Sequence, residues 1–325
     1  MLPEDNMGKK TFTAAVVGLG NIGLGYDLLH NKDYVQTHSK AYLKHRGFNL
    51  AFGVDPDPKK RAAFKSFSQC SPFGSLSDAI KDFPSVNIVS VCVAPENRGS
   101  LWDVISFLKP KVVVLEKPLA KEIAEGERII SWARKNKITV VVNYIRRFEP
   151  TTYVLKAALE KKRLGKMVGV DIRYNGGFYN NASHYIDLMM LFFGKPRKAR
   201  HTQAKKSGHD LDVDFVLDYP SFEVQGRSVN TNCPVGELTF WCERGKFFYQ
   251  KFGQQIDVYE AKPDPVFRKF KELTLINTIP GTTAYAMSNM VDHVYDCCNG
   301  QVKLLSDGKS AMETLIVCEN ILSKR

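Results

Sequence analysis

The chain has 325 residues, of which 44% are hydrophobic and 25% charged, a composition typical of a soluble globular protein with room for two domains. No stretch approaches the ~18 consecutive apolar residues of a membrane-spanning helix, and the first ten residues lead into no signal-type apolar core, so we expect a cytoplasmic protein that does not bind membranes. The formal net charge of +12 is spread along the chain, which argues against a nucleic-acid binder and is compatible with an anionic small-molecule ligand.

The N-terminal part, residues 10–150, alternates short apolar runs with helical stretches. This rhythm is typical of a parallel sheet wound with helices, and the runs are rich in Val and Ile, as in strands covered on both faces. We predict strands at Phe12–Val17, Asn49–Val54, Val86–Val93, Val112–Leu115 and Ile138–Val142.

The pattern changes after Pro150, and we predict a second domain over residues 151–325. A helical stretch at 151–163 precedes Val168–Tyr174, whose alternation indicates a strand with one buried face. Consecutive alternating runs predict an open, mostly antiparallel sheet, with strands at Val213–Leu217, Phe222–Val229, Leu238–Cys242 and Phe247–Phe252. Helical periodicity returns from about residue 283, and these helices can pack back on the first domain.

Gly18-Leu19-Gly20-Asn21-Ile22-Gly23 follows the first predicted strand and opens a helix. A G-x-G-x-x-G in this context favours dinucleotide binding over a tight turn without a ligand. Gly18 permits the turn, Gly20 lets the backbone approach a pyrophosphate, and Gly23 lets helix and strand pack closely.

Asp55 ends the second predicted strand, where a carboxylate can accept hydrogen bonds from adenosine ribose hydroxyls. It lies 32 residues beyond Gly23, more than the usual ~20, which indicates an insertion. Because a carboxylate repels a 2′-phosphate, it favours NAD over NADP. The alternative is that Asp55 only begins the Asp-Pro-Asp-Pro turn.

Glu116-Lys117-Pro118 directly follows the strand Val112–Leu115. Ligands of parallel α/β sheets bind at strand carboxyl ends, and the proline restricts the lysine backbone, so Lys117 is a candidate acid/base. A surface lysine without function is the alternative.

His184 and Asp187 lie three residues apart near the start of a predicted helix that an Asn or Ser caps and Gly194 ends. The residues alone leave His184 open between catalysis and a structural hydrogen bond. The seven cysteines form no C-x-x-C pair, so we expect reduced thiols, and the sequence indicates no metal.

Together these features resemble the Gfo/Idh/MocA (glucose–fructose oxidoreductase, inositol dehydrogenase, rhizopine catabolism) family. The resemblance covers about half the chain through GLGNIG, Asp55, Ala94-Pro95, EKP at 116–118, NYIRRFEP at 143–150 and NNASHYID at 180–187. It implies a Rossmann domain, a C-terminal domain with an open sheet, and a homodimer or homotetramer formed through that sheet.

The resemblance also implies roles for individual residues. Lys117, joined to Pro118 by a cis peptide, would relay the hydroxyl proton, and His184 would bind substrate and take part in proton exchange. Many members carry Asp where this chain has Asn180, and an amide cannot act as a base. Substrate contacts are implied at Asn180, Asn181, Asp187 and Arg147, and cofactor contacts at Gly18, Gly20, Asn21, Ile22, Gly23, Asp55, Ala94, Pro95, Glu116, Lys117 and Asn143.

The sequence therefore predicts an NAD-dependent oxidoreductase acting on a secondary alcohol or ketone of a sugar, inositol or nucleotide-linked sugar. The alternative is a dinucleotide-binding regulator that keeps the fold without turnover, because fold does not fix function. Lys117 and His184 favour the enzyme, and Asn180 favours the regulator.

Overall fold

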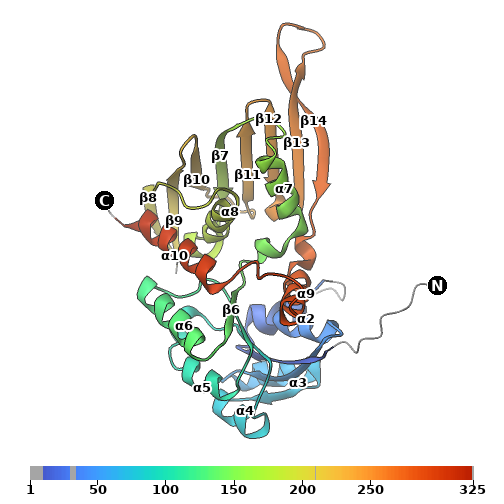
Figure 1. The fold of residues 1–325 in the computed structure, drawn as a ribbon, viewed down its shortest axis with the longest axis vertical. Coiled ribbons are helices and arrows are strands. Elements are labelled where there is room, and N and C mark those ends of the chain that lie inside the picture. Colours follow the sequence, from blue (N-terminus) through green and yellow to red (C-terminus); the bar gives the residue numbers. More distant parts are fainter. Residues whose placement is uncertain (1–9, 30–33, 209, 324–325) are drawn as a thin grey trace, which may run out of the picture. The chain divides into compact units, whose positions relative to one another are not determined.

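The computed structural model describes residues 10–29, 34–208 and 210–323, and the chain forms two compact units (Figure 1). Unit 1 comprises Met1–Asn143 and Ala284–Met312, and unit 2 comprises Tyr144–Thr283 and Glu313–Arg325. Among the described residues, no helix is both long and apolar enough to cross a bilayer.

Unit 1 contains a six-stranded parallel sheet in the order β3-β2-β1-β4-β5-β6. Its strands are β1 (Phe12–Val17), β2 (Phe48–Val54), β3 (Ser71–Phe73), β4 (Ile88–Val91), β5 (Val112–Leu115) and β6 (Thr139–Val142). The five predicted strands are present, with ends that differ by up to two residues. The sequence did not predict β3, a three-residue edge strand that includes a proline and has no fully buried residue.

The helices of unit 1 connect these strands, except α9, which comes from the C-terminal segment of the unit. They are η1 (Asn21–Gly25), α1 (Tyr26–Leu29), α2 (His38–Lys44), α3 (Pro58–Ser68), α4 (Leu76–Asp82), η2 (Pro95–Asn97), α5 (Leu101–Phe107), α6 (Ile123–Lys135) and α9 (Ala286–Cys298), with η6 (Thr283–Tyr285) at the unit boundary. The long β1–β2 connection, predicted as an insertion, holds both α1 and α2, and residues 30–33 lie outside the described part. Buried Asp27 pairs with Lys40 at 3.1 Å and accepts from Thr37 Oγ1 at 2.6 Å, which fixes α1 to α2.

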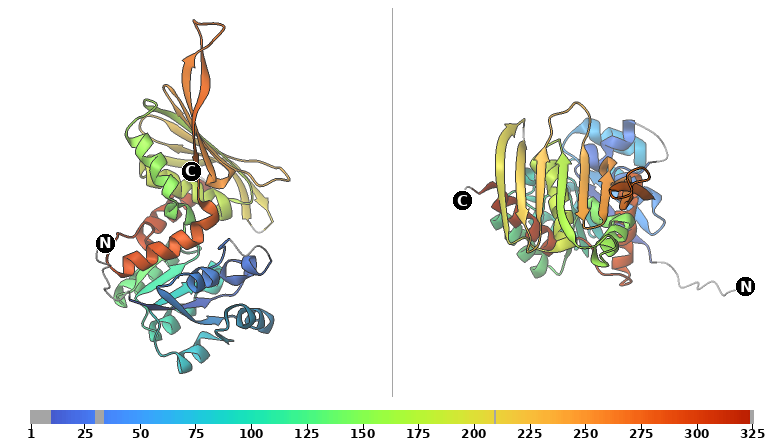
Figure 2. Two further views of the ribbon diagram at one scale, coloured as in Figure 1. Left: turned by 90° about the vertical axis from the view of Figure 1, so that its right-hand side faces the viewer. Right: turned by 90° about the horizontal axis from the view of Figure 1, so that it is seen from above.

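Unit 2 contains an eight-stranded sheet in the order β14-β13-β12-β11-β7-β10-β9-β8, whose strands lie side by side in Figure 2. Its pairs are antiparallel except for β7 with β10, which is parallel. The strands are β7 (Met167–Tyr174), β8 (Lys198–Ser207), β9 (Asp210–Asp218), β10 (Glu223–Ser228), β11 (Gly236–Cys242), β12 (Gly245–Gln250), β13 (Gln255–Pro263) and β14 (Lys271–Pro280). The mostly antiparallel sheet predicted from the sequence is confirmed.

One face of this sheet packs against helices of the same unit. Buried sheet residues such as Ile172 and Phe240 form one cluster with Ile186 and Ile321. The helices of unit 2 are η3 (Ile145–Phe148), α7 (Pro150–Glu160), η4 (Phe178–Ala182), α8 (Ser183–Phe193), η5 (Lys251–Gly253) and most of α10 (Gly308–Leu322).

The opposite face of the sheet carries polar and aromatic side chains. Lys246 Nζ lies 5.0 Å from the Trp241 ring, 5.6 Å from Phe248 and 4.9 Å from Tyr259. The predicted alternation of β7 holds at Val170, Ile172 and Tyr174, which are buried. It was wrong for Val168, which is 60% exposed because the ladder with β11 is irregular between Trp241 and Cys242.

Candidate functional site

The turn after β1 has the backbone geometry that its glycines predict. Gly18 has φ +93°, and its N–H donates to Val54 O at 2.8 Å, which joins the ends of β1 and β2. A Cβ at Gly23 would lie only 2.0 Å from Gly18 O, so the helical turn packs against the strand end at a distance that only glycine allows. The helix begins with a π-helical turn over Asn21–Gly25.

A pocket of about 840 Å³ opens in unit 1 beside this turn. The predicted cofactor residues Gly18, Gly20, Asp55 and Ala94 line it. A Cβ on Gly20 would meet no atom within 4 Å, so the backbone there is open to a ligand. The predicted residues Asn21, Ile22, Gly23, Pro95, Glu116, Lys117 and Asn143 are not among those that line the pocket.

Asp55 is buried and also has a structural role. Its carboxylate accepts from Leu19 N at 2.9 Å and from Asp57 N at 2.9 Å, so it ties the glycine turn to the end of β2. Each carboxylate oxygen has two lone pairs, which leaves acceptor capacity for ribose hydroxyls. Asp55 therefore lines the pocket and also begins the turn.

Five further polar residues line the pocket that sequence reasoning missed: Lys60, Ser75, Ser77, Asn97 and Ser100. Lys60 Nζ lies 3.6 Å from Asp55 Oδ2, and Ser75 and Ser77 follow the edge strand β3. The carboxyl ends of parallel strands meet at one edge of a sheet, so predicting β3 would have found the two serines.

Glu116, Lys117 and Asn143 follow the adjacent strands β5 and β6. Glu116 Oε1 accepts from Asn143 Nδ2 at 2.7 Å and pairs with His38 Nε2 at 2.8 Å. Lys117 is half-buried, and its peptide bond to Pro118 is cis, as the resemblance implies. Asn143 Oδ1 is buried without a hydrogen-bond partner in the described part of the chain. An acceptor of this kind suits the carboxamide N–H of a nicotinamide, so the residues present fit the dinucleotide.

His184 belongs to unit 2 and lies at the start of α8. The side chain is buried, and its ring meets the Tyr144 ring edge-on at a centroid distance of 5.7 Å. The predicted Asn or Ser cap of this helix was wrong: η4 precedes α8 directly, and Ser183 Oγ donates backwards to Tyr179 O at 2.7 Å. Gly194 ends the helix with φ +74°, as predicted.

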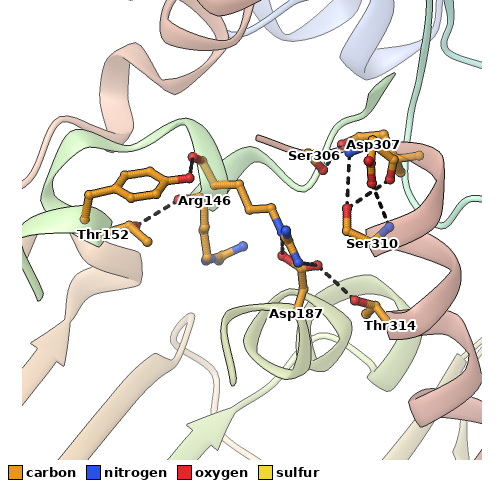
Figure 3. A network of polar contacts seen from close by, with 10 residues as sticks. Arg146, Thr152, Asp187, Ser306, Asp307, Ser310 and Thr314 are labelled. Carbon is orange, nitrogen blue, oxygen red and sulfur yellow. Dashed lines mark hydrogen bonds and ion pairs between the residues drawn. The ribbon is translucent and has the colours of Figure 1, made fainter. Parts of the chain in front are cut away.

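Arg147 and Asp187 form a buried bidentate ion pair within unit 2. Arg147 Nε and Nη2 donate to the two Asp187 carboxylate oxygens at 2.7 and 2.8 Å. Thr314 Oγ1 donates to the same carboxylate at 2.9 Å (Figure 3). The resemblance implied substrate contacts here, but these groups bind one another and join η3, α8 and α10. Their geometry therefore corresponds to a structural role.

Asn180 and Asn181 lie in η4 and hydrogen-bond to the loop before it. Asn180 Nδ2 donates to Gly176 O at 3.1 Å, and Asn181 Nδ2 donates to Asn175 O at 2.7 Å. The Asn180 backbone N–H donates to Asp210 Oδ2 at 2.9 Å. Asn180 is exposed and Asn181 half-buried, so Asn180 has the more accessible amide.

Comparison with known proteins agrees with this geometry. Residues 12–144 match the model of an oxidoreductase family with an NAD-binding Rossmann fold. An uncharacterized oxidoreductase of Escherichia coli, YhhX, is 25% identical over 190 residues, which are 48% of this chain and 55% of that protein. The chain thus spans about half the length of the curated relatives it matches.

Two solved structures share the fold along most of the chain. The WlbA dehydrogenase of Bordetella pertussis, in complex with NADH and UDP-GlcNAcA, has a TM-score of 0.75 at 18% identity and aligns over 96% of this chain and 95% of its own. UDP-N-acetylglucosamine 3-dehydrogenase GnnA of Acidithiobacillus ferrooxidans has a TM-score of 0.74 at 14% identity, over 96% of each chain.

The matched region contains the glycine turn, the pocket and the Glu116-Lys117-Pro118 segment. Residues 12–144 thus match the Gfo/Idh/MocA family of oxidoreductases, with an NAD-binding Rossmann fold.

Proposed function

We propose that this protein is an NAD(P)-dependent oxidoreductase that transfers hydride to or from a secondary alcohol or ketone of a sugar, inositol or nucleotide-linked sugar. The observation that carries the proposal is the pocket at the carboxyl ends of β1, β2 and β4, with its glycine turn and Asp55. The substrate class is supported by GnnA, which is named a UDP-N-acetylglucosamine 3-dehydrogenase, and by WlbA, which was solved in complex with UDP-GlcNAcA.

Lys117 is the proposed acid/base. A bound dinucleotide would supply the hydride acceptor for oxidation of the carbinol carbon and the hydride donor for reduction of the carbonyl carbon. During oxidation the Lys117 amine takes the hydroxyl proton, and during reduction the ammonium returns it to the new hydroxyl. Asn180 cannot titrate, so the proton must pass through Lys117 or His184. We assign His184 and the exposed Asn180 to substrate positioning.

We propose NAD as the preferred dinucleotide, because the Asp55 carboxylate lines the pocket and repels a 2′-phosphate. Lys60 lies 3.6 Å from Asp55 and offsets part of that repulsion. The gap between NAD and NADP affinity is therefore expected to be modest.

We also propose a homodimer or homotetramer formed across the polar–aromatic face of the eight-stranded sheet. The apolar residues Val170 and Ile172 lie on the other face of this sheet and are covered by helices of the same unit. The support now comes from Trp241 and Leu275, which are 36% and 50% exposed. Aromatic side chains are enriched at protein interfaces.

The proposed activity is tested with a panel of sugars, inositols and nucleotide-linked sugars, each incubated with NAD or NADP while reduced nicotinamide is measured by absorbance. Turnover of one panel member that disappears in Lys117→Met supports the enzyme. Tight dinucleotide binding in calorimetry without turnover of any panel member, in either direction, would favour the regulator instead.

A further inference from the structure

Arg98 is the largest side chain that is fully buried in the described part of the protein. Its guanidinium donates to four backbone carbonyls: Val93 O at 2.7 Å, Glu116 O at 2.7 Å, Pro118 O at 2.8 Å and Leu119 O at 3.2 Å. A guanidinium has five N–H donors in a fixed planar arrangement, so four bonds fix its orientation almost completely. Arg98 thereby ties the segment after β4 to the segment after β5.

A second set of contacts holds the Glu116 side chain. Its Oε1 accepts from Asn143 Nδ2 and pairs with His38 Nε2, while His38 Nδ1 lies 3.1 Å from Ser90 Oγ. His38 is fully buried on α2, the helix that the long β1–β2 connection adds.

Burial opposes the charge of His38, but Cys92 and Glu116 raise the pKa of His38 to about 10. Burial likewise opposes the Glu116 charge, but His38, Asn143 and Lys117 lower the pKa of Glu116. The raised pKa of His38 and the lowered pKa of Glu116 both correspond to a charged imidazolium–carboxylate pair.

Lys117 stands between these two anchors. The carbonyl of the residue before it and the carbonyl of the residue after it both bind the same guanidinium, and the preceding side chain is held by His38 and Asn143. Arg98, which follows η2, therefore fixes the peptide before Lys117 and the peptide after Pro118. His38 of α2 and Asn143, which follows β6, fix the Glu116 side chain. A misplacement of about 1 Å at a reacting group can cost about 10²-fold in rate, so such anchoring has a catalytic consequence.

We propose that Arg98 and the His38–Glu116 pair are positioning residues that hold the backbone of Lys117 in its catalytic conformation and balance the charge beside it. The inference rests on the proposed role of Lys117. Without His38, the negative charge of the Glu116 carboxylate would make Lys117 hold its proton more tightly. The positive charge of His38 cancels the charge of that carboxylate. The other charged or titratable groups near Arg98 and His38 are Cys92, Tyr42, Glu96 and Glu125.

The test measures the pH dependence of Lys117 modification, which needs no substrate. Reductive methylation with formaldehyde and borohydride, followed by peptide mass spectrometry, gives the rate at Lys117 at each pH. His38→Asn leaves Glu116 unbalanced, so the Lys117 profile is expected to move to higher pH. His38→Asn with Glu116→Gln removes both charges, so the profile is expected to return toward that of the native protein.

Arg98→Lys keeps the charge but cannot make four directed bonds, and we expect about a 10²-fold loss of kcat with KM and NADH affinity little changed. Arg244→Met is the matched control, because Arg244 also donates to a backbone carbonyl, Arg163 O at 2.8 Å, but is exposed in unit 2. If Arg98→Lys does not fold, His38→Asn and the double variant still carry the test.

An unchanged Lys117 methylation profile in His38→Asn overturns the inference, even if the melting temperature falls. So does an Arg98→Lys protein with native kcat. Failure of this inference and failure of the proposed function can be told apart. Absence of turnover in the native protein refutes the proposed activity, whereas the methylation profile needs no turnover and still tests the anchoring of Lys117.

Discussion

The buried pair of Arg147 and Asp187 gives the sharpest prediction about stability. Their side chains are 7% and 1% exposed, and two direct hydrogen bonds join them. Arg147→Met removes both charged donors and leaves the carboxylate enclosed. Breaking a buried pair from one side costs about 3–5 kcal/mol, because the remaining charge is uncompensated.

Hydrogen exchange resolved by peptide measures this loss locally. Peptides from α8 should exchange about 10²–10⁴-fold faster in Arg147→Met, the equivalent of the expected free energy. Adding Asp187→Leu should recover most of the protection, because an apolar pair can replace a buried ion pair at little cost. Arg200→Met is the control: its partner Asp218 lies 3.8 Å away, Arg200 is 51% exposed, and such pairs contribute about 0–1 kcal/mol.

Equal exchange in Arg147→Met and Arg200→Met would refute the structural role. A rise in KM without any change in exchange would restore the substrate-binding role that the family resemblance implied for Arg147.

Three further predictions concern cofactor, pH and assembly. Calorimetry should find NAD(H) bound more tightly than NADP(H), with Asp55→Ala narrowing the gap; tighter NADP(H) binding by the native protein would refute the role of Asp55. In the folded protein the pKa of His38 is about 10, above its ordinary value of 6.5. Protonated His38 therefore stabilises the folded protein fully below pH 6.5, and this stabilisation is lost as the pH rises through 10. The melting temperature should fall over that window in the native protein but not in His38→Asn, and parallel curves would contradict the ion pair. Light scattering at micromolar concentration should give a dimer or tetramer that Trp241→Asp weakens, and a monomeric native protein would rule out the assembly.

Much of the fold was predictable because parallel strands buried on both faces leave an unmistakable apolar run. Phe12–Val17 and Val112–Leu115 were predicted with the bounds that the structure has. Of the four strands that escaped prediction, β3, β8 and β14 lie at sheet edges, and β13 lies next to β14. β14 is exposed along most of its length and β8 is rich in Lys and Arg, so neither shows the alternation of a half-buried strand.

The site residues that could be predicted are those at positions where the backbone geometry requires one residue type. Gly18 and Gly23 are required by a positive φ and by a close approach, and both are visible in the motif. Arg98 and His38 were not predicted as part of the site, since their partners are backbone carbonyls and a carboxylate more than fifteen residues away. Only the three-dimensional structure brings such groups together.

The central claim is that Lys117 transfers the proton in an NAD-dependent oxidation. Its most direct test compares native protein with Lys117→Met on a substrate identified from the panel, measuring kcat, KM and NADH affinity together. We predict that Lys117→Met loses at least about 10²-fold in kcat with NADH binding nearly intact, while His184→Ala raises KM as well as lowering kcat. Near-native turnover by Lys117→Met would contradict it.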